Sequence, residues 1–101
     1  MTFSNYRRLV RIIKAEYPHI KWCIRRCRVR KSVEGWCFEK DGTFYIQVSN
    51  ELDEDLAIST LIHEASHPLS WKEWTKTEQH GPEFGKAYGE IYRLYEKHLT
   101  K

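Results

Sequence analysis

The sequence predicts an α+β domain in which a helix precedes three short strands and two further helices follow. Three observations predict it. Apolar residues recur at intervals of three and four near both ends of the chain, β-branched and aromatic residues alternate in its middle, and the length of 101 residues suits one domain. No internal repeat or Pro/Gly/Ser-rich linker divides the sequence. We therefore expect a single domain over residues 1–101.

The first helix is expected over residues 3–17. Its apolar residues follow helical spacing, and Pro18 stops the pattern: Tyr6, Leu9, Val10, Ile13 and Tyr17. This stripe should pack against the rest of the domain.

Three strands are expected over residues 21–30, 35–39 and 43–48, where β-branched and aromatic residues alternate. Along the last of these, Phe44, Ile46 and Val48 share one face. The segment Lys40-Asp41-Gly42 supplies a hairpin turn between the second and third strands.

The second helix is expected over residues 56–67, preceded by acids that favour a helix N-terminus: Asp53, Glu54 and Asp55. Pro68 should end or kink it, leaving a loop over residues 68–80. Gly81-Pro82 then opens a third helix. The apolar side of that helix comprises Phe84, Ala87, Tyr88, Ile91, Leu94 and Tyr95.

Composition predicts an intracellular, cytoplasmic protein without a membrane span. No apolar run approaches the roughly 20 residues that a span needs, and charges interrupt the N-terminal segment where a signal peptide would be apolar. The content of 41% hydrophobic and 14% aromatic residues excludes wholesale disorder. The three cysteines form no Cys-x-x-Cys pair, so we expect reduced thiols.

The net charge of +3 is unevenly distributed. Residues 1–40 carry 11 Lys and Arg against 3 acids, whereas residues 41–101 carry 6 against 11. In the segment from 21 to 31, alternation would place three arginines on one strand face, where they could contact DNA phosphates: Arg26, Arg28 and Arg30. The alternative is an edge strand whose charges prevent aggregation.

The strongest motif is H-E-x-x-H, formed by His63, Glu64 and His67. A spacing of four places both imidazoles on one helix face, within reach of one ion. Glu64 lies about 100° further round, where it can contact a metal-bound water without ligating the metal. The motif predicts one Zn²⁺ per chain with Glu64 as the catalytic base.

A catalytic zinc site has three protein ligands and one open position, so a third ligand should come from downstream. His80, Glu83 and Glu90 are the candidates. His80 is favoured because neutral imidazole suits zinc, and Glu83 is its main rival.

H-E-x-x-H and the downstream segment His-Gly-Pro-Glu-Phe (residues 80–84) together resemble the SprT-like zinc metallopeptidases, which include the protease domain of Spartan-type proteins. The resemblance covers most of the chain. It implies a zincin-like fold, with His63, His67 and His80 as zinc ligands and Glu64 as general base. The cysteine-rich zinc ribbon of many members is absent. The chain therefore resembles a minimal, stand-alone catalytic domain of a kind also found in phage genomes.

The resemblance implies hydrolysis of peptide bonds in a peptide or protein substrate. In zincins the strand before the motif helix is an edge along which an extended peptide lies, which here would be residues 43–48. Tyr45 and Gln47 would be its substrate-binding residues, facing away from Phe44 and Ile46. Tyr88 and Tyr95 follow His80 on the third helix. They are candidates to stabilise the oxyanion, with core packing as their alternative role.

Two other functions remain open from the sequence. One is a nucleic-acid-associated module in which zinc is structural and proteolysis is absent. The other is a hydrolase that uses the same zinc chemistry on a substrate other than a peptide.

Overall fold

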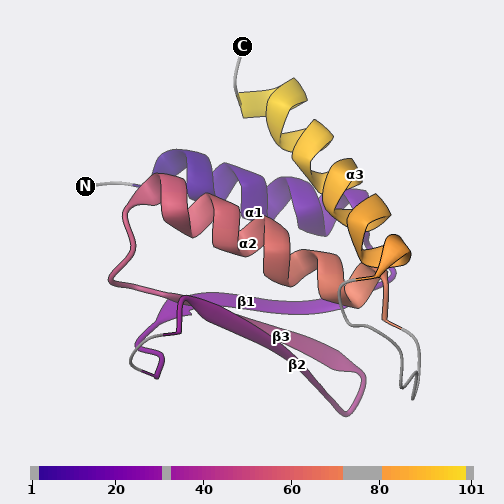
Figure 1. Cartoon of the computed structure of the whole chain (residues 1–101), viewed down its shortest axis with the longest axis horizontal. Helices are drawn as coiled ribbons and strands as arrows, with labels where there is room; N and C mark the ends of the chain where they lie inside the picture. Colours follow the sequence, from indigo (N-terminus) through magenta and orange to yellow (C-terminus); the bar gives the residue numbers. More distant parts are fainter. Residues whose placement is uncertain (1–2, 31–32, 72–80, 100–101) are drawn as a thin grey trace.

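The computed structural model describes residues 3–30, 33–71 and 81–99. Within these ranges the chain forms an α+β fold, in which three helices lie on one face of a three-stranded sheet (Figure 1). The elements in chain order are α1 (Ser4–Glu16), β1 (Lys21–Cys27), β2 (Gly35–Lys40), β3 (Thr43–Ser49), α2 (Glu54–Leu69) and α3 (Pro82–Leu99). The predicted order of elements is confirmed.

The sheet has the order β1-β3-β2, so β3 is its central strand. β3 pairs in parallel with β1 and antiparallel with β2. Asp41 and Gly42 connect β2 to β3 with φ angles of 52° and 85°. Two successive positive φ values are typical of the two-residue turns that match the twist of a hairpin. The predicted hairpin turn is therefore confirmed.

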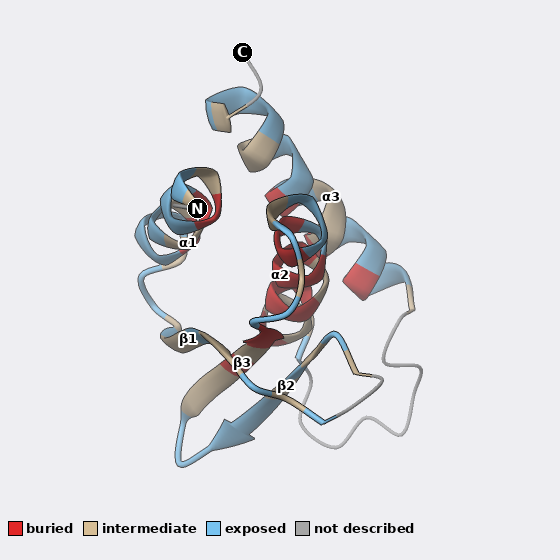
Figure 2. Cartoon of the chain, turned by 90° about the vertical axis from the view of Figure 1, so that its left-hand side faces the viewer, coloured by how far each residue is buried: buried red, intermediate tan, exposed pale blue. Residues whose placement is uncertain are grey.

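The core lies between the sheet and the helices. Of the β3 residues that face the helices, Ile46 and Val48 are buried and Phe44 is half-buried. The alternate residues Tyr45 and Gln47, which point to the opposite face, are both half-buried. Figure 2 shows the buried residues concentrated in α2 and on the sides of its neighbours that face it. The largest fully buried apolar side chains are Leu9, Ile13, Ile46, Leu61, Ile62, Ile91 and Val48. The predicted apolar faces of α1 and β3 are confirmed.

α2 begins at a side-chain cap and ends just after a proline. The Asp53 carboxylate accepts a hydrogen bond from the Leu56 N–H at 2.9 Å, which satisfies one donor of the first turn. Pro68 lies inside the last turn, and the helix ends at Leu69. The prediction of a loop over residues 68–80 is therefore wrong for Pro68 and Leu69, which belong to α2. Proline lacks an N–H but adopts helical φ, so one further residue can follow it.

The N-terminus of α1 is capped by a residue from α2. Phe3, which precedes α1, has a φ of 46° and supplies no side-chain cap. Instead, Glu54 Oε2 accepts hydrogen bonds from the backbone N–H groups of Asn5 and Tyr6, at 3.0 and 3.1 Å. A carboxylate at this position also interacts favourably with the positive end of the helix dipole. The first turn of α2 therefore holds α1 in place.

α3 begins at Pro82, as predicted, and its buried residues are Phe84, Ala87 and Ile91. Proline suits the first helical position because the N–H that it lacks would have no intrahelical partner there. None of the helices in the described part of the chain has the length and apolar character needed to cross a membrane.

Candidate metal centre

His63, Glu64 and His67 come together on α2, as the motif predicts. One possible ligand atom from each residue lies within 4.8 Å of those of the other two. The two imidazole rings are 5.4 Å apart between centroids and nearly perpendicular, at 76°. Both histidines are half-buried, because α2 lies between the sheet and α3 at this point. The three side chains form a cluster that could hold a metal ion.

Glu64 is the buried member of this cluster, with 9% of its surface exposed. Burial raises the pKa of its carboxyl from 4.5 to about 7, because the charged form is poorly solvated there. Its Oε1 lies 3.9 Å from His67 Nε2. A carboxyl with a pKa near neutrality can both accept and release a proton under physiological conditions.

Phe84 of α3 covers both imidazoles. Its ring centroid lies 5.1 Å from that of His63 and 4.8 Å from that of His67. Phe84 is itself 9% exposed, so the contact removes one side of the histidine pair from water. The sequence pattern places Phe84 in the apolar stripe of the third helix. The feature of the sequence that indicates a role at the site is that Phe84 belongs to the segment His-Gly-Pro-Glu-Phe, residues 80–84.

β2 forms a second wall beside Glu64. A methyl group at Gly35 would lie 3.6 Å from Glu64 Cγ, so the strand passes close to the Glu64 side chain. Burial, and secondarily the charge of Glu64, raise the pKa of the Cys37 thiol from 9.0 to about 12. Neither Gly35 nor Cys37 was recognised from the sequence, because no local pattern indicates which strand packs beside α2.

The third ligand is not decided by the described residues. His80, the favoured candidate, lies outside them. Glu83 is exposed in the first turn of α3. The Glu90 carboxylate accepts a hydrogen bond from the Tyr17 hydroxyl at 3.0 Å, which directs it toward α1. This placement argues against Glu90 as a ligand.

The two tyrosines expected near the oxyanion lie on α3, and both pack against the core. The Tyr88 ring is 6.2 Å from that of Phe84, one helical turn from the site. Tyr95 lies two turns further on, with its ring 6.0 Å from that of Tyr92. Of the two, Tyr88 is therefore the one placed near the histidines.

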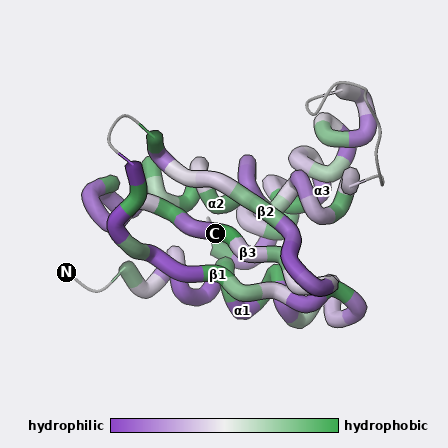
Figure 3. Tube along the Cα trace, turned by 90° about the horizontal axis from the view of Figure 1, so that it is seen from below, coloured by the Kyte–Doolittle hydropathy of each residue, from purple (hydrophilic) through white to green (hydrophobic). Residues whose placement is uncertain are grey.

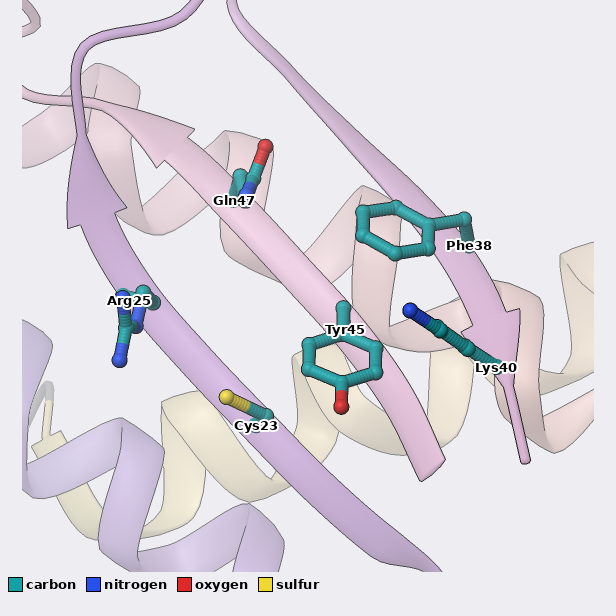
Figure 4. A pocket seen from close by; sticks show the side chains of 6 residues that line it. All are labelled: Cys23, Arg25, Phe38, Lys40, Tyr45 and Gln47. Atoms are coloured by element: carbon teal, nitrogen blue, oxygen red, sulfur yellow. The ribbon is translucent and has the colours of Figure 1, made fainter. Parts of the chain in front are cut away.

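Residues 43–48 do not form an edge strand. They belong to β3, which is paired on both sides, so the prediction that a peptide lies along this strand as an edge is wrong. Sequence patterns indicate which residues form strands but not their order in the sheet. Tyr45 and Gln47 instead line a pocket on the sheet face that points away from the helices (Figure 4). The structure therefore does not bring them together with His63.

The expected basic strand face also differs in the structure. β1 is an edge strand of the described sheet but ends at Cys27, so Arg28 and Arg30 lie beyond it. Arg26 is half-buried and donates hydrogen bonds to the carbonyls of Ser49 and Leu52, at 3.1 and 2.9 Å. The prediction that three arginines share one strand face is wrong, because Arg26 turns inward.

Comparison of this chain with protein-family models, with curated proteins and with solved structures found no match.

Proposed function

We propose that the protein is a zinc-dependent peptidase with a zincin-like site, resembling the SprT-like metallopeptidases. The observation that carries this proposal is the cluster of His63, Glu64 and His67, whose potential ligand atoms lie within 4.8 Å of one another on one helix. Two imidazoles on one face of a helix suit Zn²⁺.

The surroundings fit a catalytic role better than a purely packed core. Two histidines and a glutamate occupy a helix whose other buried residues are mostly apolar, and the free-energy cost of burying such groups can be offset by hydrogen bonds or by a bound ion. His63 and His67 would hold the ion together with a downstream ligand, for which His80 is the candidate. When bound, zinc would supply the Lewis acidity that polarises a peptide carbonyl and so favours hydrolysis of the peptide bond.

Glu64 is the proposed general base and acid. Its carboxylate would accept a proton from the attacking water and then donate that proton to the nitrogen of the leaving amine. Burial keeps the carboxyl pKa near neutrality, although a bound cation would lower it. Phe84, packed on both imidazoles, would hold their orientation and exclude water from one side.

We infer that β2, and not the central strand β3, would guide the substrate. It is an edge strand of the described sheet, and it passes Glu64 at Gly35. An extended peptide that hydrogen-bonds to a sheet edge gains affinity through its main chain, without regard to its sequence. This arrangement would bring a scissile peptide bond close to the histidine pair.

The first test measures zinc and hydrolysis together. Protein purified without added metal should contain one zinc per chain by elemental analysis, and it should cleave casein or a peptide library. Glu64→Gln should keep the zinc and lose hydrolysis, whereas Glu51→Gln, at an exposed position, should change neither. A protein that takes up no zinc on titration would refute the site. Stoichiometric zinc without hydrolysis of any peptide would instead indicate a structural metal.

The second test decides the third ligand. His80→Ala should lower zinc affinity as strongly as His63→Ala. Glu83→Ala should leave zinc bound, with a loss of affinity or activity of at most about 10- to 100-fold. His19→Ala, at an exposed site, is the matched control. The opposite ranking of His80 and Glu83 would assign the site to the glutamate-ligated class.

A further inference from the structure

The sheet face opposite the helices is lined by aromatic and basic side chains. Figure 3 shows the three strands from below, in front of the helices. The alternation of the strands places nine residues on this face in three rows across the sheet. The rows are Lys21, Thr43 and Lys40, then Cys23, Tyr45 and Phe38, then Arg25, Gln47 and Trp36. We call this surface the open face.

The open face presents flat aromatic rings to solvent. Phe38 and Trp36 are 40% and 36% exposed, which places both among the exposed large apolar side chains of the described residues. The Phe38 ring stacks on that of Tyr45 at 5.0 Å between centroids and 11° between planes. The Trp36 indole N–H donates a hydrogen bond to the Gln47 side-chain carbonyl, which fixes the orientation of the indole ring. These rings are held in place before any partner binds.

The charges on the open face are all positive. The row that contains Tyr45 and Phe38 lies between rows that carry the cations Lys21, Lys40 and Arg25. A further cation, Arg30, places its guanidinium 5.8 Å from the centre of the Trp36 ring. None of the nine open-face residues is an acid. Glu39 of β2 lies on the other parity, and its carboxylate accepts a hydrogen bond from the Gly42 N–H at 2.7 Å. The face therefore complements a polyanion.

We propose that the open face binds single-stranded nucleic acid. Exposed rings on which bases can stack, surrounded by cations that contact phosphates, are the two elements that single-strand binding surfaces combine. A duplex would engage only the cations, because its bases are already stacked on one another. The surface differs from the arginine face predicted from the sequence, since the half-buried Arg26 bonds the Ser49 and Leu52 carbonyls and is not one of the nine open-face residues.

The pocket on this face gives the proposal a location (Figure 4). Its lining combines an aromatic pair with basic and polar side chains from all three strands: Cys23, Arg25, Phe38, Lys40, Tyr45 and Gln47. If a base stacked on Phe38, its flanking phosphates would lie near Arg25 and Lys40, which line the same pocket. The candidate metal centre lies on α2, on the helix side of the sheet, so binding at the open face does not depend on the proposed peptidase activity.

The test uses fluorescence anisotropy of the full chain with a labelled oligothymidylate of about 12 nucleotides at about 50 mM salt, where phosphate contacts are strong. Phe38→Ala should weaken binding by about 5-fold or more, since stacking of one base contributes roughly 5- to 150-fold. Tyr92→Ala, an aromatic of matching exposure on α3, should not change it. Binding should also persist in Glu64→Gln, which separates this result from the outcome at the metal centre.

A second set of variants tests the cations and does not touch the aromatic packing. Arg25→Gln and Lys40→Gln should each reduce the slope of log affinity against log salt by about 0.7, the value for one phosphate contact on a single strand. Lys14→Gln, at an exposed position of α1, is the charge-matched control.

Several results would overturn the proposal. They are no binding at low salt, equal affinities of Phe38→Ala and Tyr92→Ala, or tighter binding to a duplex of the same sequence. A stable dimer in sedimentation that dissociates on Phe38→Ala would likewise show that a second copy of the chain covers the face.

Discussion

Gly35 of β2 lies directly against Thr60 of α2. A Cβ atom at Gly35 would come within 2.7 Å of Thr60 Cγ2 and within 2.7 Å of the Gln47 carbonyl oxygen. Thr60 is one helical turn before Glu64, so the missing side chain is what allows β2 to approach the candidate site. The contact sets the spacing between the strand and the motif helix.

Gly35→Ala should therefore lower the free energy of unfolding by about 1–3 kcal/mol, because the added methyl group overpacks this contact. Gly85→Ala is the control, since nothing lies within 4 Å of its added methyl group and alanine favours a helix. It should raise stability by about 0.5–1 kcal/mol. Urea denaturation of both variants measures the difference, and a neutral Gly35→Ala would contradict the close approach.

Tyr6 carries a buried hydroxyl without a hydrogen-bond partner among the described residues. Burial raises the pKa of this hydroxyl to about 12. Because an unsatisfied buried hydroxyl costs free energy, Tyr6→Phe should raise stability by about 1 kcal/mol. Tyr17→Phe removes the hydrogen bond to Glu90 and should instead lower stability by about 0.5–1 kcal/mol. Thermal unfolding of the two variants measures the difference. Shifts of the unfolding temperature in the same direction for Tyr6→Phe and Tyr17→Phe would contradict an unsatisfied Tyr6 hydroxyl.

Arg26 should be a residue of the fold and not of a binding surface. Its guanidinium donates to the Ser49 and Leu52 carbonyls and lies 4.0 Å from the centre of the Phe3 ring. Arg26→Ser should lower the free energy of unfolding by about 2–3 kcal/mol, since both carbonyls lose a charged donor. Arg25→Ser, on the exposed strand surface, should cost less than about 0.5 kcal/mol. Equal stabilities of the two variants in urea would contradict this assignment.

The Cys37 thiol should react slowly with iodoacetamide. Its pKa is raised from 9.0 to about 12, so the reactive thiolate is about a thousandfold less abundant below pH 9 than in an ordinary cysteine. The rate should keep rising with pH toward about 12, and Glu64→Gln should increase it, because a neighbouring negative charge disfavours the thiolate. Mass spectrometry of alkylated peptides measures the rates, with half-buried Cys23 as the internal reference. Modification of Cys37 at the rate of Cys23 at pH 8 would contradict the raised pKa of its thiol.

Local patterns predicted much of the fold, because they depend on residues close together in the chain. The spacing of Tyr6, Leu9 and Ile13 is enough to place one face of α1 in the core, and the Asp41-Gly42 pair is enough to form a hairpin turn. Even the capping of α2 by Asp53 is a contact over three residues. Strand ends were less accurate, since β1 stops at Cys27 where pairing with β3 ends.

By itself, the sequence determined the elements and the H-E-x-x-H cluster, because the four-residue spacing of His63 and His67 acts within one helix. Only the tertiary structure decided what surrounds them. Strand order depends on pairing between distant segments, which the period-two pattern does not encode, and so β3 became central and β2 came to lie beside Glu64. The contact of Phe84 with both histidines likewise depends on how α3 packs against α2, a choice that the apolar stripe of α3 leaves open.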